Sequence, residues 1–209
     1  MNQNQIKWLA TILMLIDHVG VLIESEPMRI IGRLSFPLFA WVFAQNWQRP
    51  GEKKKLINRL LLFGIISQIP YVLLFNNLQL NIMFSFAAGA TTFSCIRKFN
   101  RKIIILAIGL TASQILGISY GWYAVACPLM MISLKGKGDR MWWIGWSITN
   151  IIYAASSGSL IQLFAILTPI ILAYHDPAKN QKPTAIEKKF FYYFYPVHLA
   201  GLAALRTIL

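Results

Sequence analysis

The chain has 209 residues, of which 56% are hydrophobic and only 13% are charged. Because a soluble domain carries about a quarter charged residues, this composition excludes an ordinary water-exposed surface and indicates an integral membrane protein. The net charge of +13 comes from short basic clusters between apolar runs, which is typical of loops held at an anionic membrane surface, so we expect the lipid bilayer and no nucleic acid as a partner.

Nine apolar segments follow one another along the chain as predicted transmembrane helices. They cover residues 6–23, 30–47, 56–75, 80–96, 103–118, 120–134, 141–156, 159–174 and 190–208. Several are shorter than the ~20 residues that a perpendicular span needs, so the fifth to eighth could be re-entrant or lie deep inside the bundle. No linker is long enough to separate domains. The expected fold is an all-α integral membrane bundle of about nine (8–10) helices, with residues 1–209 forming a single polytopic domain.

Lys and Arg concentrate in every second connection between these segments. The residues concerned are Lys7; Arg49, Lys53, Lys54, Lys55 and Arg59; Arg97, Lys98, Arg101 and Lys102; Lys135, Lys137 and Arg140; and Lys179, Lys182, Lys188 and Lys189. The intervening connections at 76–79, at 119 and at 157–158 carry no charge. The positive-inside rule then predicts a cytoplasmic N-terminus, in a multi-pass protein of the bacterial inner membrane. The aromatic run 190–196 is predicted to lie at the interface where the last segment enters the bilayer.

Seven polar side chains fall within the predicted spans, in the middle or outer half of the bilayer. They are Asp17, His18, Arg33, Gln68, Tyr71, Asn81 and His198. At 1.5 Å per residue, Asp17 and His18 lie roughly 17 Å into the first span. Ionisable residues inside a bilayer are costly and tend to mark function. Their shared depth therefore predicts one polar pocket that opens toward the outer face.

Each of these residues also has a purely structural interpretation. Asp17 and Arg33 could form an ion pair that holds the first two spans together. His18 could be a hydrogen-bonded core residue, and Gln68 and Asn81 could simply hold helices together by hydrogen bonds.

Histidine would supply the chemistry of such a pocket, because an imidazole with a pKa near about 6.5 exchanges protons at neutral pH. A carboxylate on its other nitrogen would fix the tautomer and raise its basicity. Adjacent helical residues point about 100° apart, so Asp17 is not expected to orient His18. It could instead orient His198 or pair with Arg33. No ligand spacing marks a metal site, and no fingerprint of ATP hydrolysis or hydride transfer is present.

Five stretches occur in order along the chain: LATILMLIDHVG, RIIGRLSFPLFAW, RLLLFGIISQIPY, LNIMFSF and KKFFYYFYPVHLAGL. Together they resemble the TraX family, whose members are membrane proteins related to the pilin acetylases of conjugation systems. The resemblance runs from about residue 7 to residue 203. Over 97–174 it rests mainly on hydrophobic character and on the pair Tyr120 and Gly121.

The resemblance implies transfer of an acetyl group from acetyl-CoA to an acceptor. The acceptor is a peptide N-terminal amine in the pilin case, and a sugar or a small-molecule amine stays open. The implied catalytic residues are His18, Asp17 and His198, and the implied acetyl-CoA-binding residues are Arg33, Gln68, Tyr71, Asn81 and Tyr120. We expect His18 to be the general base, with His198 as the alternate and Asp17 orienting a partner. Arg33 would contact a CoA phosphate or the developing oxyanion.

Acetyl-CoA is cytoplasmic, whereas the predicted pocket leans outward. The pantetheine arm must therefore thread into the bundle, or the acetyl group must be relayed. The basic loops 49–59 and 97–102 could bind the CoA phosphates, although retention at the membrane explains these loops without a ligand. Two other functions stay open: a proton-coupled transporter with Asp17, His18 and His198 as its proton relay, and a non-catalytic membrane assembly factor.

Overall fold

The computed structural model of the chain describes residues 1–209 except 50, 52, 135–138, 182, 183 and 209. The regular elements of the described residues are helices, apart from a single bridge between Leu80 and Ile118. Contacts divide the chain into two compact units, each assembled from segments far apart in the sequence. The first unit comprises Met1–Gln45 and Met130–Lys188, and the second comprises Asn46–Leu129 and Lys189–Leu209. The prediction of a single polytopic domain is not tested by this division.

The helices of the first unit are α1 (Gln3–Leu22), α2 (Glu26–Gly32), α8 (Arg140–Ser157) and α9 (Thr168–Ala173), with the 3-10 helices η1 (Leu160–Leu167) and η2 (Pro177–Lys179). A capping box begins α1, because the Asn2 side chain accepts from the Gln5 amide and the Gln5 side chain accepts from the Asn2 amide, both at 2.8 Å. Glu24, at φ 55°, turns the chain from α1 into α2.

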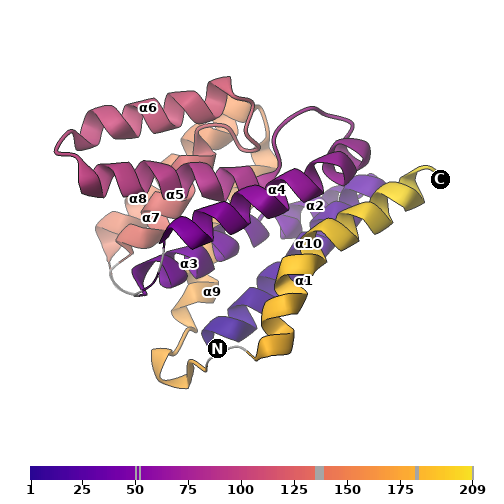
Figure 1. Ribbon diagram of the computed structural model, residues 1–209, viewed down its shortest axis with the longest axis horizontal. Coiled ribbons are helices and arrows are strands. Elements are labelled where there is room, and N and C mark those ends of the chain that lie inside the picture. Colours follow the sequence, from indigo (N-terminus) through magenta and orange to yellow (C-terminus); the bar gives the residue numbers. More distant parts are fainter. Residues whose placement is uncertain (50, 52, 135–138, 182–183, 209) are drawn as a thin grey trace. The chain divides into compact units, whose positions relative to one another are not determined.

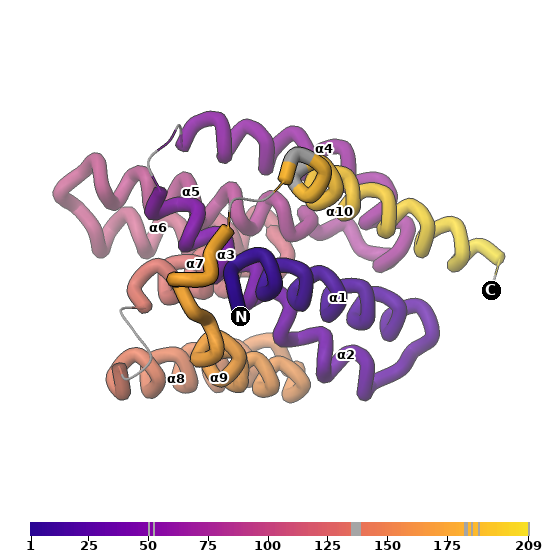
Figure 2. The backbone as a smooth tube through the Cα atoms, turned by 90° about the horizontal axis from the view of Figure 1, so that it is seen from below, coloured from indigo at the N-terminus to yellow at the C-terminus, as the bar shows by residue number. Residues whose placement is uncertain are grey.

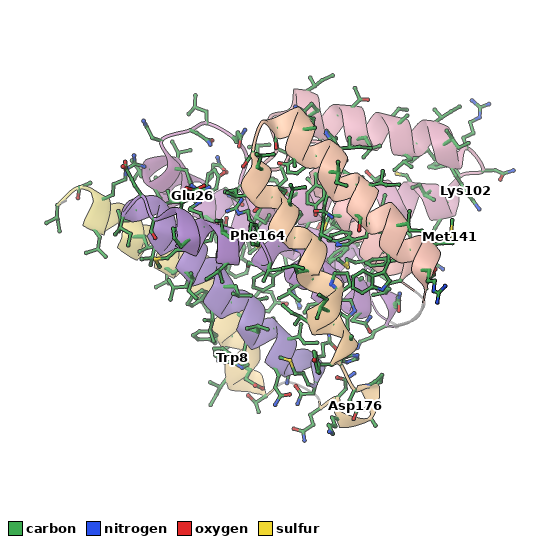
Figure 3. The ribbon with its side chains drawn as sticks, turned by 180° about the vertical axis from the view of Figure 1, so that it is seen from behind. Trp8, Glu26, Lys102, Met141, Phe164 and Asp176 are labelled. Atoms are coloured by element: carbon green, nitrogen blue, oxygen red, sulfur yellow. The ribbon has the colours of Figure 1, made fainter. Side chains whose placement is uncertain are left out.

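Helix α8 packs against η1, the segment that carries Phe164 in Figure 3. The indole of Trp146 on α8 is fully buried and donates to the main-chain carbonyl of Ala165 at 3.2 Å. This bond gives the polar edge of a large apolar side chain a partner inside the core. The first unit is thus held by a hairpin of α1 and α2 and by the packing of α8 on η1.

The second unit contains α4 (Lys53–Phe75), α5 (Ile82–Lys98), α6 (Lys102–Ile115) and most of α10 (Ala185–Arg206). Helices α4, α5 and α6 run back and forth in sequence order (Figure 1). Helix α10 runs alongside α4 in the same direction (Figure 2), since Arg59 bonds to Tyr192 near one end and Leu74 bonds to Arg206 near the other. The remaining helices, α3 (Ser35–Gln48) and α7 (Tyr123–Ser133), each pass from one unit to the other.

Two turns of the second unit are joined by main-chain hydrogen bonds. Leu80 donates to the Gly117 carbonyl at 2.9 Å, and Ser119 donates to the Leu80 carbonyl at 2.7 Å. The second turn contains three residues with positive φ, namely Gly117 at 62°, Tyr120 at 67° and Gly121 at 52°. A tyrosine rarely adopts this left-handed conformation, so the surrounding contacts must hold Tyr120 in place.

The apolar surface of the helices agrees with a lipid environment. Helices α1 and α4 are long and apolar enough to cross a membrane, and Lys102–Ile115, Tyr123–Ser133 and Leu160–Ala173 are shorter apolar helices. On α4, Ile69 is 74% exposed, and Ile65 and Leu73 are similarly exposed. Contiguous exposed apolar side chains are unusual on a soluble monomer. The described residues therefore form an all-helical structure compatible with a helical membrane protein.

Several predicted spans differ from the helices that form. The predicted span 30–47 is broken after Gly32, because α2 ends there and α3 begins only at Ser35. The predicted span 120–134 begins with the turn at Tyr120, so its helix starts at Tyr123. The predicted span 159–174 begins as the 3-10 helix η1. The existence of nine transmembrane helices is not established by these elements.

Candidate functional site

Asp17 lies at the centre of an ion-pair cluster in the first unit. It is 7% exposed, and its carboxylate accepts a hydrogen bond from the Arg33 guanidinium. The Nε atom of Arg29 lies 3.4 Å from the same carboxylate oxygen. That nitrogen is buried and has no hydrogen-bond geometry, so its interaction with Asp17 is electrostatic. Arg29 and Arg33 are four residues apart, a spacing that brings both onto one face of a helical turn.

Gly32 makes this cluster possible. A Cβ atom at position 32 would lie 2.3 Å from the Cβ of Asp17, which is a severe overlap. The absence of a side chain thus lets α1 and α2 approach closely enough for the two guanidinium groups to reach the carboxylate. The ion pair between Asp17 and Arg33, one of the two partners the sequence left open, is present. His18 is buried on the same helix, and its role as general base stays a prediction.

Gln68 and Asn81 form a hydrogen-bonded cluster in the second unit. The Gln68 side chain donates to the Gln79 carbonyl at 2.8 Å and accepts from the main-chain and side-chain nitrogens of Asn81 at 3.1 and 2.8 Å. Asn81 also donates to the Gly64 carbonyl at 2.7 Å and caps α5 by accepting from the Met83 amide at 3.1 Å. Asn81 is 0% exposed. This geometry is that of the interhelical fastening considered above, and acetyl-CoA binding by either residue stays untested.

The tautomer of His198 is set by its own helix. Its Nδ1 lies 2.7 Å from the Phe194 carbonyl oxygen. A carbonyl can only accept, so Nδ1 carries the proton and Nε2 carries the lone pair of the neutral ring. The imidazole stacks on the Phe194 ring at 4.6 Å and meets the Tyr195 ring edge-on at 5.5 Å. A buried imidazole in this tautomer presents Nε2 as its basic atom.

Tyr195, which contacts this histidine, interacts with two further tyrosines. Tyr71 and Ser119 share a side-chain hydrogen bond. The hydroxyl of Tyr195 accepts from the amide of Ile82, the first residue of α5, and lies within electrostatic range of Tyr71 and Tyr120. Tyr71 and Tyr195 are both buried. The second unit thus brings the predicted residues Tyr71, Tyr120 and His198 together around Tyr195.

Two members of these clusters were not predicted from the sequence. Arg29 could have been found from its four-residue spacing to Arg33. Tyr195 could have been found from its three-residue spacing to His198, which places both on neighbouring parts of one helix face. Its position in an aromatic run had instead indicated the membrane interface.

The predicted site residues are divided between the units. Asp17, His18 and Arg33 belong to the first, and the other five belong to the second. Within each unit the clusters are as described, and the single pocket of seven residues, to which the resemblance adds Tyr120, stays a prediction. Among the described residues, no group of three or more His, Cys, Asp or Glu could hold a metal ion.

An apolar surface hollow in the second unit contains none of the predicted residues. Its volume is about 320 Å³. It is lined by Leu110, Thr111, Gln114, Ile115 and Trp122. These side chains include no group that titrates near neutral pH, so the hollow offers no acid or base for acetyl transfer.

Comparison with known proteins gives similarity over almost the whole chain. The family model described as "TraX protein" matches residues 2–206. The chain is 29% identical over 211 residues to Protein TraX of Escherichia coli, covering 96% of this chain and 85% of that protein. It is 23% identical over 253 residues to the probable fimbrial assembly protein FimC, serogroup H1, of Dichelobacter nodosus, covering 98% and 96%. Protein TraX of Escherichia coli strain K12 is 31% identical over 142 residues, covering 65% and 57%. No solved structure matches the chain significantly.

Proposed function

The chain belongs to the TraX family, and from this premise we propose that it is a membrane-embedded acetyltransferase that moves the acetyl group of acetyl-CoA to an amine. The observation that carries the proposal is the His198 imidazole, whose Nδ1–H is held by the Phe194 carbonyl at 2.7 Å. This contact leaves Nε2 as the basic nitrogen of the neutral ring. The sequence favoured His18 as the base, and the contacts in the second unit support the alternate, His198.

The reaction needs a base, an oxyanion partner and a route for one proton. Nε2 of His198 takes a proton from the acceptor amine while the amine nitrogen attacks the thioester carbonyl. The C–S bond then breaks with its electron pair on sulfur, and the imidazolium returns the proton to the CoA thiolate. The products are the acetylated amine and free CoA. Hydroxyls of Tyr71, Tyr120 and Tyr195 are the donors in this cluster that could stabilise the tetrahedral oxyanion.

We propose a peptide N-terminus as the acceptor. One relative is named a probable fimbrial assembly protein, and the family resemblance includes pilin acetylases. An amine acceptor also suits a neutral imidazole base, because attack requires loss of one N–H proton. Transfer to a sugar hydroxyl or to a small-molecule amine would be detected, in the assay described below, by the mass of the acetylated product.

We place this activity in a multi-pass protein of the bacterial inner membrane with a cytoplasmic N-terminus. The proposal keeps the nine predicted segments as crossings or re-entrant elements. It is supported by alternation of basic and uncharged connections and by the exposed apolar side chains of α4. Labelling of single cysteines at Asn77 and Arg101 from opposite sides of the membrane is expected. Labelling of both from one side would contradict this topology.

A transporter is less well supported by the geometry. Its proton relay would use Asp17, His18 and His198. The Asp17 carboxylate is engaged by Arg33 and lies 3.4 Å from Arg29, an arrangement that suits a structural ion pair.

The test is release of free CoA thiol by the purified protein in detergent. Acetyl-CoA would be mixed with peptides bearing a free or a blocked N-terminus, and the acetylated product identified by mass. Transfer to the free N-terminus is expected, with large losses in His198→Ala and smaller ones in His18→Ala. Full transfer by both variants would exclude His18 and His198 as the base, and no thiol release with any acceptor would refute acetyl transfer.

A further inference from the structure

The second unit carries a strongly basic surface around the start of α4 and at the turn from α5 to α6. We call these side chains the basic patch: Arg49, Lys53, Lys54, Lys55, Arg59, Arg97, Lys98, Arg101 and Lys102. All of them are exposed except Lys53, which is partly buried, and Lys102 marks the start of α6 in Figure 3. The two segments contain a single acidic residue in the sequence, Glu52. The patch therefore has a large excess of positive charge.

The fold brings charges together from both segments. Lys53 lies close enough to Arg97 for the two charges to repel each other. The ammonium group of Lys53 is held in place by the carbonyls of Trp47 and Arg49, the latter at 2.7 Å. Retention of a loop on one side of a membrane requires positive charge in that loop. It does not require charges from two different loops to converge against their mutual repulsion.

Aromatic rings lie beside three of these cations. Lys53 lies over the Trp47 ring at 5.2 Å, and Lys98 lies over the Phe99 ring at 5.2 Å. Arg59 donates to the Tyr192 hydroxyl at 3.1 Å and lies 5.7 Å from its ring centre. The Phe99 ring is 51% exposed. Trp47 is buried, so Phe99 and Tyr192 are the two rings of this set that reach the surface. Cations beside exposed rings suit a ligand that carries both phosphates and a base, because phosphates pair with the cations and the base stacks on a ring.

Helix α10 connects the basic patch to the histidine cluster. Tyr192, Tyr195 and His198 recur every three residues on this helix. Six residues of α-helix rise by roughly 9 Å. A ligand whose phosphates lie near Arg59 and Tyr192 thus needs only a flexible arm of moderate length to bring a thioester to His198. The pantetheine arm of CoA is such an arm.

We propose that the basic patch binds the phosphates of the nucleotide end of an acyl-CoA donor, with the adjacent exposed ring of Phe99 available to the adenine. The inference rests on the proposed acetyltransferase function and assigns the donor's anchoring site to this surface. Anionic lipid headgroups share the phosphate chemistry, but they have no base to place on Phe99.

The probe is adenosine 3′,5′-bisphosphate, which carries the adenine and two of the three phosphate groups of CoA but no thioester. Its binding to the full chain would be measured in lipid nanodiscs of neutral phosphatidylcholine. The double variant Arg97→Gln/Lys98→Gln is expected to weaken this binding about tenfold. Binding of acetyl-CoA should weaken by a similar factor. S-acetylpantetheine lacks the nucleotide, so the parent and the double variant should use it as a donor equally well.

Two controls separate the patch from general charge effects. The variant Arg97→Lys/Lys98→Arg keeps both charges and should bind nearly as the parent does. Lys179→Gln removes a charge that pairs with Asp176 at 3.5 Å in the first unit, and it should leave nucleotide binding unchanged. Equal binding by the parent and the Gln double variant would overturn the proposal. The proposal would also fail if the Gln double variant changed only the binding of added phosphatidylglycerol, because the patch would then bind lipid.

The result for the patch does not depend on acetyl transfer. If the parent binds the bisphosphate through Arg97 and Lys98 but releases no thiol from acetyl-CoA, the nucleotide site stands and the acetyltransferase proposal fails. If thiol is released at equal rates by parent and double variant at limiting acetyl-CoA, the acetyltransferase stands and the patch assignment fails.

Discussion

The two polar clusters of the second unit differ in whether their side chains can titrate. Five hydrogen bonds tie the side chains of Gln68 and Asn81 to each other or to the main chain. In the other cluster, one ring nitrogen of His198 is fixed by a carbonyl, and the remaining nitrogen is the basic one. Amides do not titrate, whereas an imidazole does. Residues predicted at a similar depth therefore differ: Gln68 and Asn81 hold helices together, and His198 carries the proton transfer proposed above.

The largest expected effect is on the rate of acetyl transfer in His198→Asn. The Asn amide can still donate to the Phe194 carbonyl, but it has no basic nitrogen in place of Nε2. Loss of a general base typically lowers a rate by about 10²- to 10⁴-fold. Thiol release and thermal unfolding in detergent would be measured on the same preparation. A normal rate of thiol release at normal stability would show that another residue is the general base.

Asn81→Ala should show the opposite signature. The change removes the cap of α5 and leaves the Gly64 carbonyl and the Gln68 side chain without this partner. We expect a loss of about 3 kcal/mol in the free energy of unfolding, with transfer retained at low temperature. Asn58→Ala, at an exposed position of α4, is the matched control. An Asn81→Ala variant that is stable but inactive would show that Asn81 acts in acetyl transfer and not only in holding the helices together.

Gly32→Ala tests the cluster around Asp17. The added methyl would overlap the Asp17 side chain, so α1 and α2 must separate. Overpacking of this kind costs about 1–3 kcal/mol, measured by thermal unfolding. Gly201→Ala meets nothing within 4 Å and should be neutral or slightly stabilising. Equal stability of the two variants would show that α1 and α2 are not in close contact at Gly32.

The smallest expected effect is that of Tyr195→Phe. This variant keeps the ring beside His198 and removes the hydroxyl that accepts from the Ile82 amide. A lost hydrogen bond of this kind costs about 1 kcal/mol of stability. Tyr193→Phe, at a position that is 60% exposed, should cost almost nothing. A large loss of transfer in Tyr195→Phe without a loss of stability would make its hydroxyl part of the chemistry.

Sequence patterns could predict the all-helical fold class and some contacts within the polar clusters. Exposed apolar faces such as that of α4 follow directly from composition. The pairing of Asp17 with Arg33 could be predicted as one of two partners, because opposite charges at one depth in lipid seek each other. The fastening role of Gln68 and Asn81 could likewise be stated, but only as an alternative, since amide orientation depends on tertiary contacts.

The rest depends on contacts that no local pattern contains. Hydropathy runs smoothly through 30–47, yet the close packing of Gly32 on Asp17 accompanies a break between two helices. In the aromatic run, Tyr193 is largely exposed and Tyr195 is buried. Composition predicts an interfacial location for both. Their difference comes from neighbours on α4 and α5, such as the Ile82 amide that bonds to Tyr195.

The paired main-chain bonds at Leu80 also bear on motion. Amides in turns usually exchange their hydrogens with solvent quickly, because local opening costs little. Here the amides of Leu80 and Ser119 are each bonded to the opposite turn, so both turns must open together before either amide is released. We therefore expect the turn that holds Tyr120 and the turn that leads to the cap of α5 to open together, with slow exchange of both amides. The main chain alone then links the start of α5 to Tyr120.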